Sequence, residues 1–135
     1  MSKTTEMILK IKDRLSEPRY WFKGALYEYS ADLADHPYTT PACLLGAHLD
    51  TLTDRAAWFD QDGPYDVGAL LVDVINADPA NIAITEVILE QFPGRAIRGG
   101  EEYKTPWHVI PNFNDDIETT HEDIILVLEK AAINS

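Results

Sequence analysis

The residues best suited to covalent chemistry are a single cysteine and a histidine far downstream of it. Cys43 falls in the first turn of a predicted helix, where backbone N–H groups and the helix dipole stabilise a thiolate. His108 follows, and Asn112, Asn114 and Asp115 lie beyond it, which is the order of papain-like hydrolases. One alternative function is therefore a cysteine-dependent hydrolase that uses Cys43 and His108. Because the local signatures of those enzymes are absent, we favour a structural role for Cys43, as a small buried thiol.

An acidic turn near the middle of the chain resembles a calcium loop only superficially. Asp60, Asp62 and Asp66 supply suitable carboxylates. In an EF-hand register, however, Gly63 falls at the fourth position instead of the sixth, and Leu71 occupies the twelfth. We interpret this segment as a solvated turn.

A second acidic segment precedes the last predicted helix. Asn114, Asp115, Asp116 and Glu118, together with His121, could bind a hard cation. Asn114 and Asp115 are explained more simply by bonds to nearby backbone N–H groups that fix the entry to the helix. We therefore predict no metal and no cofactor.

The net charge narrows the choice of partners. The chain has 11 basic and 23 acidic residues, which gives −12, and residues 31–135 alone carry −14. Such a field repels nucleic-acid phosphates and anionic membrane surfaces, so we expect neither as a direct partner. It favours a basic protein partner, although acidity also serves solubility.

The acidic residues gather in two stretches, which we predict to be the binding surface. The first contains Asp50, Asp54, Asp60, Asp62 and Asp66, and the second contains Asp115, Asp116, Glu118, Glu122 and Asp123. Our leading hypothesis is a protein that acts by binding another protein, occupying a nucleic-acid-binding groove by charge mimicry. Besides the hydrolase, a protein that sequesters a small molecule is an alternative. The oligomeric state is not predicted.

A mainly helical fold must position these residues. Apolar spacing and start signals predict helices over residues 4–16, 41–52, 66–76 and 79–92, and a last one from Thr119 or Thr120 to about 131. Asp78-Pro79 is a cap followed by proline, and Thr119 and Thr120 each have a carboxylate at capping-box spacing.

Short strands complete the prediction. The aromatic segment 20–29 suggests one or two strands with a break at Gly24. Glycines and prolines make residues 94–113 irregular, with short strands at 96–98 and 107–110. Residues 1–135 are thus expected to form a single compact α+β domain of about five helices.

Three short motifs support a resemblance. They are Trp-Phe-Lys-Gly-Ala at 21–25, Cys-Leu-Leu-Gly-Ala at 43–47, and Phe-Asn-Asp at 113–115 followed by Thr-His-Glu-Asp-Ile at 120–124. Together they resemble a family of small bacterial and phage proteins classed only as a domain of unknown function, which usually has tryptophan in place of Phe113. The resemblance implies no activity. It implies a phage or mobile-element context, and with it a host-takeover or anti-defence inhibitor.

The sequence also bears on location. The first 15 residues alternate charged and apolar side chains, unlike a signal peptide, and no apolar run reaches the roughly 20 residues of a membrane span. We therefore expect a cytoplasmic protein.

Overall fold

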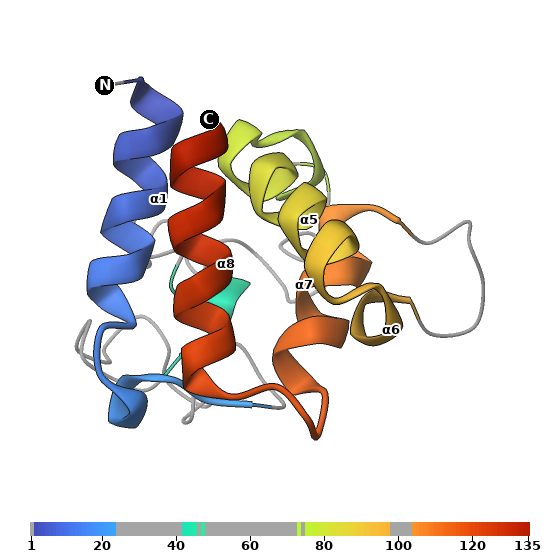
Figure 1. Cartoon of the computed structure of the whole chain (residues 1–135). Helices are drawn as coiled ribbons and strands as arrows, with labels where there is room; N and C mark the ends of the chain where they lie inside the picture. Colours follow the sequence, from blue (N-terminus) through green and yellow to red (C-terminus); the bar gives the residue numbers. More distant parts are fainter. Residues whose placement is uncertain (1, 24–41, 46, 48–72, 74, 98–103) are drawn as a thin grey trace, which may run out of the picture.

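A computed structural model of the chain describes residues 2–23, 42–45, 47, 73, 75–97 and 104–135. Of these residues 76% are helical, and they contain no strand and no sheet. The elements are α1 (Lys3–Arg14), a short 3-10 helix η1 (Pro18–Tyr20), α5 (Pro79–Gln91), α6 (Pro93–Ala96), α7 (Pro106–Asp115) and α8 (His121–Asn134) (Figure 1). Residues 44, 45, 47, 73 and 75–77 are helical as well.

Helix α8 is the centre of the arrangement. It lies between α1 and α5 and packs against both, while α7 packs against α5 and α6 (Figure 1). The core is built from the inward faces of these helices together with the segment around residue 44. Its fully buried large side chains are Phe113, Ile8, Ile11, Leu15, Leu44, Ile75, Ile84, Ile88 and Ile110.

The helix starts follow the predicted capping rules. The side chain of Asp78 accepts from the backbone N–H groups of Ala80 and Asn81, and Pro79 occupies the first turn of α5. Of the two predicted starts for the last helix, the structure has Thr120, whose hydroxyl and backbone form a reciprocal capping box with Asp123. These bonds satisfy N–H groups that a helix cannot pair internally.

The predicted strand at 107–110 was wrong, and the one predicted at 96–98 does not form over residues 96 and 97, the part that the structure describes. Ala96 ends α6, and residues 107–110 lie within α7. The prediction treated the prolines as breaks in regular structure. Pro106 instead occupies the first turn of α7, where proline is favourable, and Pro111 removes only one backbone hydrogen bond from the helix interior. The spacing of the buried residues is helical throughout: Pro106, Val109, Ile110, Phe113 and Asn114.

The aromatic segment forms no strand where the structure describes it. Trp21 and Ala42 make an isolated parallel bridge, in which Phe22 N–H donates to Ala42 O at 3.0 Å and Ala42 N–H to Tyr20 O at 2.9 Å. Residues 24–29 lie outside the described residues, as do most of the predicted helices at 41–52 and 66–76.

No helix in the described part of the chain is long and apolar enough to cross a membrane.

Candidate functional site at the motif junction

The fully buried amide of Asn114, near the end of α7, joins the three sequence motifs. Its Oδ1 accepts from the indole Nε1 of Trp21 at 2.7 Å and from the backbone N of Leu44 at 3.0 Å. Its Nδ2 donates to the carbonyl of Phe22 at 3.0 Å and to Asp115 Oδ1 at 2.9 Å. The amide thereby uses both its acceptor and donor capacity. We call Trp21, Phe22, Leu44 and Asn114 the motif junction.

The start of α8 meets the same junction through a ring contact. The rings of Trp21 and His121 have centroids 6.3 Å apart, and His121 Nε2 lies 2.6 Å from the carbonyl oxygen of Leu15. Because a carbonyl only accepts, Nε2 carries the proton in this bond. Lys23 Nζ lies 5.2 Å from the centre of a Trp21 ring and donates to Asp116 O at 2.7 Å. The ends of α1, α7 and the start of α8 therefore share one polar centre.

The turn between α7 and α8, residues 116–119, is fixed by its own bonds. Asp116 N–H donates to Phe113 O at 3.3 Å, and Thr119 N–H donates to Asp116 O at 3.1 Å. The Asp116 side chain accepts from Glu118 N–H at 2.9 Å. Ile117, at the tip, is 94% exposed. The turn thus presents an apolar side chain on an ordered backbone.

Arg95 anchors the other side of this turn. Its Nη1 donates to Asp123 Oδ2 at 2.8 Å, its Nε lies 3.9 Å from Glu118 Oε2, and its guanidinium lies 4.6 Å from the centre of the Phe92 ring. Burial raises the pKa of the Asp123 carboxyl, but bonds from the Thr120 N–H and from Arg95 lower it by more. The pKa of Asp123 therefore lies below its ordinary value.

The residues of the predicted hydrolase occupy different environments. Cys43 is 6% exposed and belongs to the hydrophobic core. His108 is exposed in the first turn of α7, where its Nδ1 lies 3.0 Å from Thr105 Oγ1. A nucleophile must reach its substrate, so the burial of Cys43 favours the structural role that we expected for it.

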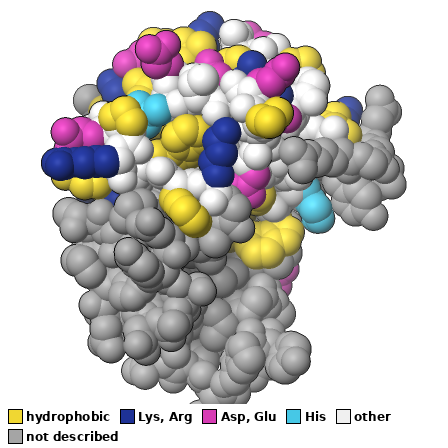
Figure 2. Space-filling view, turned by 90° about the horizontal axis from the view of Figure 1, so that it is seen from below, with side chains coloured by type: hydrophobic (Ala, Val, Ile, Leu, Met, Phe, Trp, Pro, Cys, Tyr) yellow, Lys and Arg dark blue, Asp and Glu magenta, His cyan; other side chains and the backbone are white. Residues whose placement is uncertain are grey.

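The second acidic stretch is brought together, but much of it serves local structure. Asp123 caps α8 and binds Arg95, Asp116 caps its own turn, and Asp115 accepts from Asn114. Figure 2 views the lower end of the molecule in Figure 1, and there acidic and basic side chains are interspersed. The first stretch, residues 50–66, lies outside the described residues.

Asn114 departs from the expected local role. Among the described residues, its bonds reach Trp21, Phe22 and Leu44, which are 93, 92 and 70 positions away, besides its neighbour Asp115. Its position at helical spacing from Val109, Ile110 and Phe113 was the signal that could have shown it to be buried. No group of three or more metal-binding side chains is present in the part of the chain that the structure describes.

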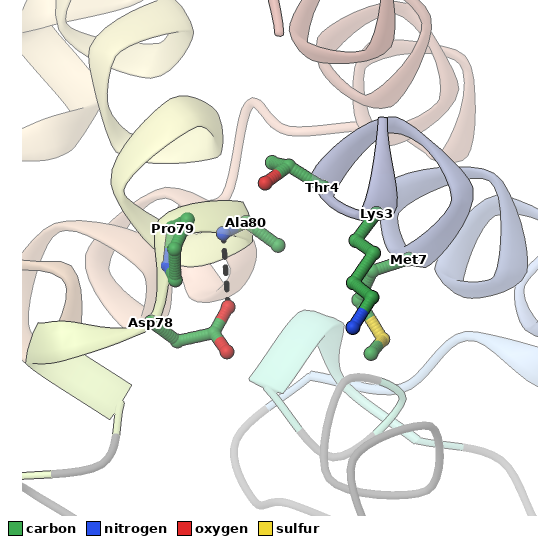
Figure 3. A pocket seen from close by; sticks show the side chains of 6 residues that line it. All are labelled: Lys3, Thr4, Met7, Asp78, Pro79 and Ala80. Carbon is green, nitrogen blue, oxygen red and sulfur yellow. Dashed lines mark hydrogen bonds between the residues drawn. The ribbon is translucent and has the colours of Figure 1, made fainter. Parts of the chain in front are cut away.

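Three surface hollows are lined by described residues. One, of about 140 Å³, lies between the starts of α1 and α5, where the Asp78 carboxylate bonds to Ala80 N, and Lys3 and Met7 face it from α1 (Figure 3). The other two, of about 300 and 360 Å³, flank the end of α8. Pockets for small organic ligands usually measure roughly 300–1,000 Å³. The first hollow is smaller than this, and the other two lie at the lower end of the range.

One comparison with known protein families finds a match. A family model described as a family of unknown function (DUF6197) matches residues 1–134. The chain belongs to this family. No curated protein and no solved structure matches it.

Proposed function

We propose that this protein acts by binding another protein, and that the 116–119 turn is its point of attachment. One observation carries the proposal: Ile117 is 94% exposed on a turn whose backbone is held by three hydrogen bonds. An isolated exposed apolar side chain is common on protein surfaces. An ordered turn that presents one is better suited to binding.

The order of the turn lowers the cost of association. Binding a flexible loop requires its backbone and side chains to be fixed, which opposes affinity. Here Asp116 already bonds to Phe113, Thr119 and Glu118, and Lys23 donates to its carbonyl. A partner therefore meets a surface with little conformational freedom left to lose.

The flanking charges indicate the chemistry of the partner. Asp115, Asp116 and Glu118 surround Ile117 in the sequence, and the Glu118 side chain is 76% exposed. The complementary surface is an apolar pocket with lysine or arginine at its rim. Lys23 lies close to Asp116, and Arg95 lies close to Glu118. The carboxylates of the turn therefore do not form a continuous acidic row like the phosphates of a nucleic acid, and they flank a single apolar side chain instead.

Mimicry of nucleic-acid charge is a more specific form of this protein-binding proposal. It depends in large part on Asp50, Asp54, Asp60, Asp62 and Asp66, which lie outside the described residues. In that form the partner would be a nucleic-acid-binding protein, and DNA or RNA would compete with this chain for it.

The test compares two exposed isoleucines. Wild type, Ile117→Ser and Ile82→Ser would be immobilised and used to capture proteins from a cell lysate, and a partner recovered by wild type would be purified. We expect Ile117→Ser to weaken its binding roughly 10- to 100-fold in calorimetry, because burial of an isoleucine contributes about 1.5–3 kcal/mol. Ile82→Ser is the control, because this isoleucine of α5 is also exposed, at 40%, and belongs to neither proposed surface.

The competing accounts predict other results. Equal affinity of Ile117→Ser and wild type for every purified partner would exclude the turn as the anchor. Displacement of the chain by nucleic acid, with a steep loss of association rate at high salt, would support mimicry.

A further inference from the structure

We propose that the outer face of α8 is the surface through which two copies of this chain associate. Leu126, Glu129, Lys130 and Ile133 recur at helical spacing on the side of α8 opposite the buried Ile124, Val127, Leu128 and Ala131. Leu126 is 37% exposed and Ile133 is 82% exposed. We call Leu126, Glu129, Lys130 and Ile133 the α8 ridge.

A hollow lies on each side of the ridge. One, of about 360 Å³, is formed with α1 and lined by Thr5, Leu9, Glu129, Ala132 and Ile133. The other, of about 300 Å³, is formed with α5 and lined by Val87, Glu90, Gln91, Lys130, Ile133 and Asn134. Ile133 borders both. The three helices lie side by side around this face (Figure 1).

This shape is complementary to itself. A two-fold axis places the same surface patch of both copies face to face, so each copy must supply both the protruding and the receiving part. The ridge is the protruding part, and the hollow formed by Leu9 and Ala132 is the receiving part. Insertion of Ile133 of one copy into that hollow of the other would remove two large apolar surfaces from water.

The charges favour a second copy over other occupants. The chain carries −12, so two copies repel unless they meet where charges balance. At this face charges of both signs lie together: Lys12 bonds to Glu129 at 3.1 Å, and Glu90 and Lys130 line one hollow together. A strongly basic partner would meet Lys12 and Lys130, whereas a second copy can place Lys130 against Glu90 or Glu129.

The ridge is separate from the proposed attachment point. Ile117 precedes α8, and Ile133 lies in its last turn. Twelve residues of helix between His121 and Ile133 span about 18 Å, at roughly 1.5 Å per residue. One copy can therefore use both surfaces at once, and the dimer would present two 116–119 turns.

Sedimentation equilibrium of the full chain across micromolar concentrations tests the proposal. We expect wild type to form dimers, and Ile133→Asp to weaken self-association at least tenfold. Ile117→Asp, which adds the same charge at another highly exposed isoleucine, should leave self-association unchanged. Circular dichroism would establish that both variants are folded.

A charge exchange gives a second measurement. Lys130→Glu should weaken the dimer, and adding Glu90→Lys to that variant should restore it, because the pairing between copies is then reversed. A monomeric wild type, a dimer that Ile133→Asp leaves intact, or equal dissociation by Ile117→Asp would each overturn the proposal. None of these outcomes depends on whether the 116–119 turn binds a partner.

Discussion

The two ends of α8 are stabilised by different interactions. At its start, Thr120 and Asp123 form a capping box, Arg95 binds Asp123, and the His121 ring bonds to Leu15 O and contacts Trp21. At its end, the core contacts are apolar, and the hollows on either side leave Ile133 82% exposed. Directional bonds, several of them part-buried, hold the start. At the end, Thr5 Oγ1 bonds to Ala132 O at 3.5 Å and to Ser135 Oγ at 2.7 Å, and an apolar side chain stays uncovered.

The difference suggests how the two regions respond to substitution. A buried polar group must be bonded, so removing one partner leaves the other unsatisfied and costly. An exposed apolar or charged side chain has water as an alternative, so its loss changes stability little. We therefore expect stability to depend on the motif junction and the start of α8, and surface interactions to depend on the end of α8.

The largest effect is expected at Asn114. Asn114→Ala leaves the Trp21 indole N–H, the Leu44 N–H and the Phe22 carbonyl without their partner. Since each buried group left unsatisfied costs about 1–3 kcal/mol, the free energy of unfolding should fall by about 3 kcal/mol or more. Urea denaturation measures this change. Asn112→Ala, which removes a single bond to Ala96 O, is the control and should cost about 1 kcal/mol.

Cys43 provides an independent measure of the same substitution. It directly precedes Leu44 and is buried, so a thiol reagent should label it slowly in the native wild type. Asn114→Ala should accelerate labelling by loosening the segment. Rapid stoichiometric labelling of native wild type would contradict a structural role for Cys43 and would support the alternative function, a cysteine-dependent hydrolase.

The next largest effect is expected at Asp123. Asp123→Asn removes the charged partner of Arg95 and weakens the capping box, which should cost about 1–2 kcal/mol at neutral pH. Because the folded pKa of Asp123 is lowered, its contribution is complete above the unfolded pKa, near 4, and is lost as pH falls through the folded value.

The pH dependence of this variant is also informative. Wild type should lose stability below about pH 4 more steeply than Asp123→Asn does. Glu122→Gln changes an exposed carboxylate in the same helical turn and serves as the control. Parallel curves for wild type and Asp123→Asn would show that the Arg95 bond adds nothing.

A smaller effect is expected at the cap itself. Thr120→Ala removes the hydroxyl that accepts from Asp123 N–H at 3.3 Å and should lower the free energy of unfolding by about 1 kcal/mol. Thr120→Ser keeps an acceptor and should restore most of the loss in thermal denaturation. A loss of equal size with serine would assign the effect to packing of the threonine methyl group.

The smallest effect is expected at the other end of α8. Lys12→Met breaks the bond to Glu129, but the two side chains are 34% and 50% exposed, so stability should change by no more than about 0.5 kcal/mol. Urea denaturation at low and high salt checks this, with Glu129→Gln as the reciprocal variant. A loss near that of Asp123→Asn would remove the contrast between the two ends.

Local signals predicted the helices that begin with clear caps. Asp78-Pro79 and the Thr120–Asp123 pair specify helix starts through side chains two or three residues away, so the sequence predicted both helices. Only the structure decided between Thr119 and Thr120 as the cap of the last one. Helix α7 was missed because Pro106 and Pro111 suggested breaks, while the buried spacing of Val109, Ile110 and Phe113 was helical. There, burial in the core outweighed the local penalty of Pro111.

The hydrogen bonds of the motif junction could not be predicted from the sequence, for a different reason. The motifs that supported the family resemblance were visible, but nothing local shows that Trp21 and Leu44 share one acceptor on Asn114. Such a bond depends on how α1 and α7 approach each other in three dimensions. The exposure of Ile117 and Ile133 was equally invisible, because periodicity does not show which apolar residues remain uncovered.

The long reach of Asn114 has a consequence for synthesis on the ribosome. Trp21 precedes Asn114 by 93 residues, which takes roughly 5–20 s to translate at about 5–20 residues per second. During that interval the Trp21 indole N–H and the Leu44 N–H lack the Asn114 acceptor that they have in the native fold, which disfavours their burial. Helix α1 also awaits its main packing partner, α8. We therefore expect this fold to form only after α8 has been synthesised, in one late cooperative step.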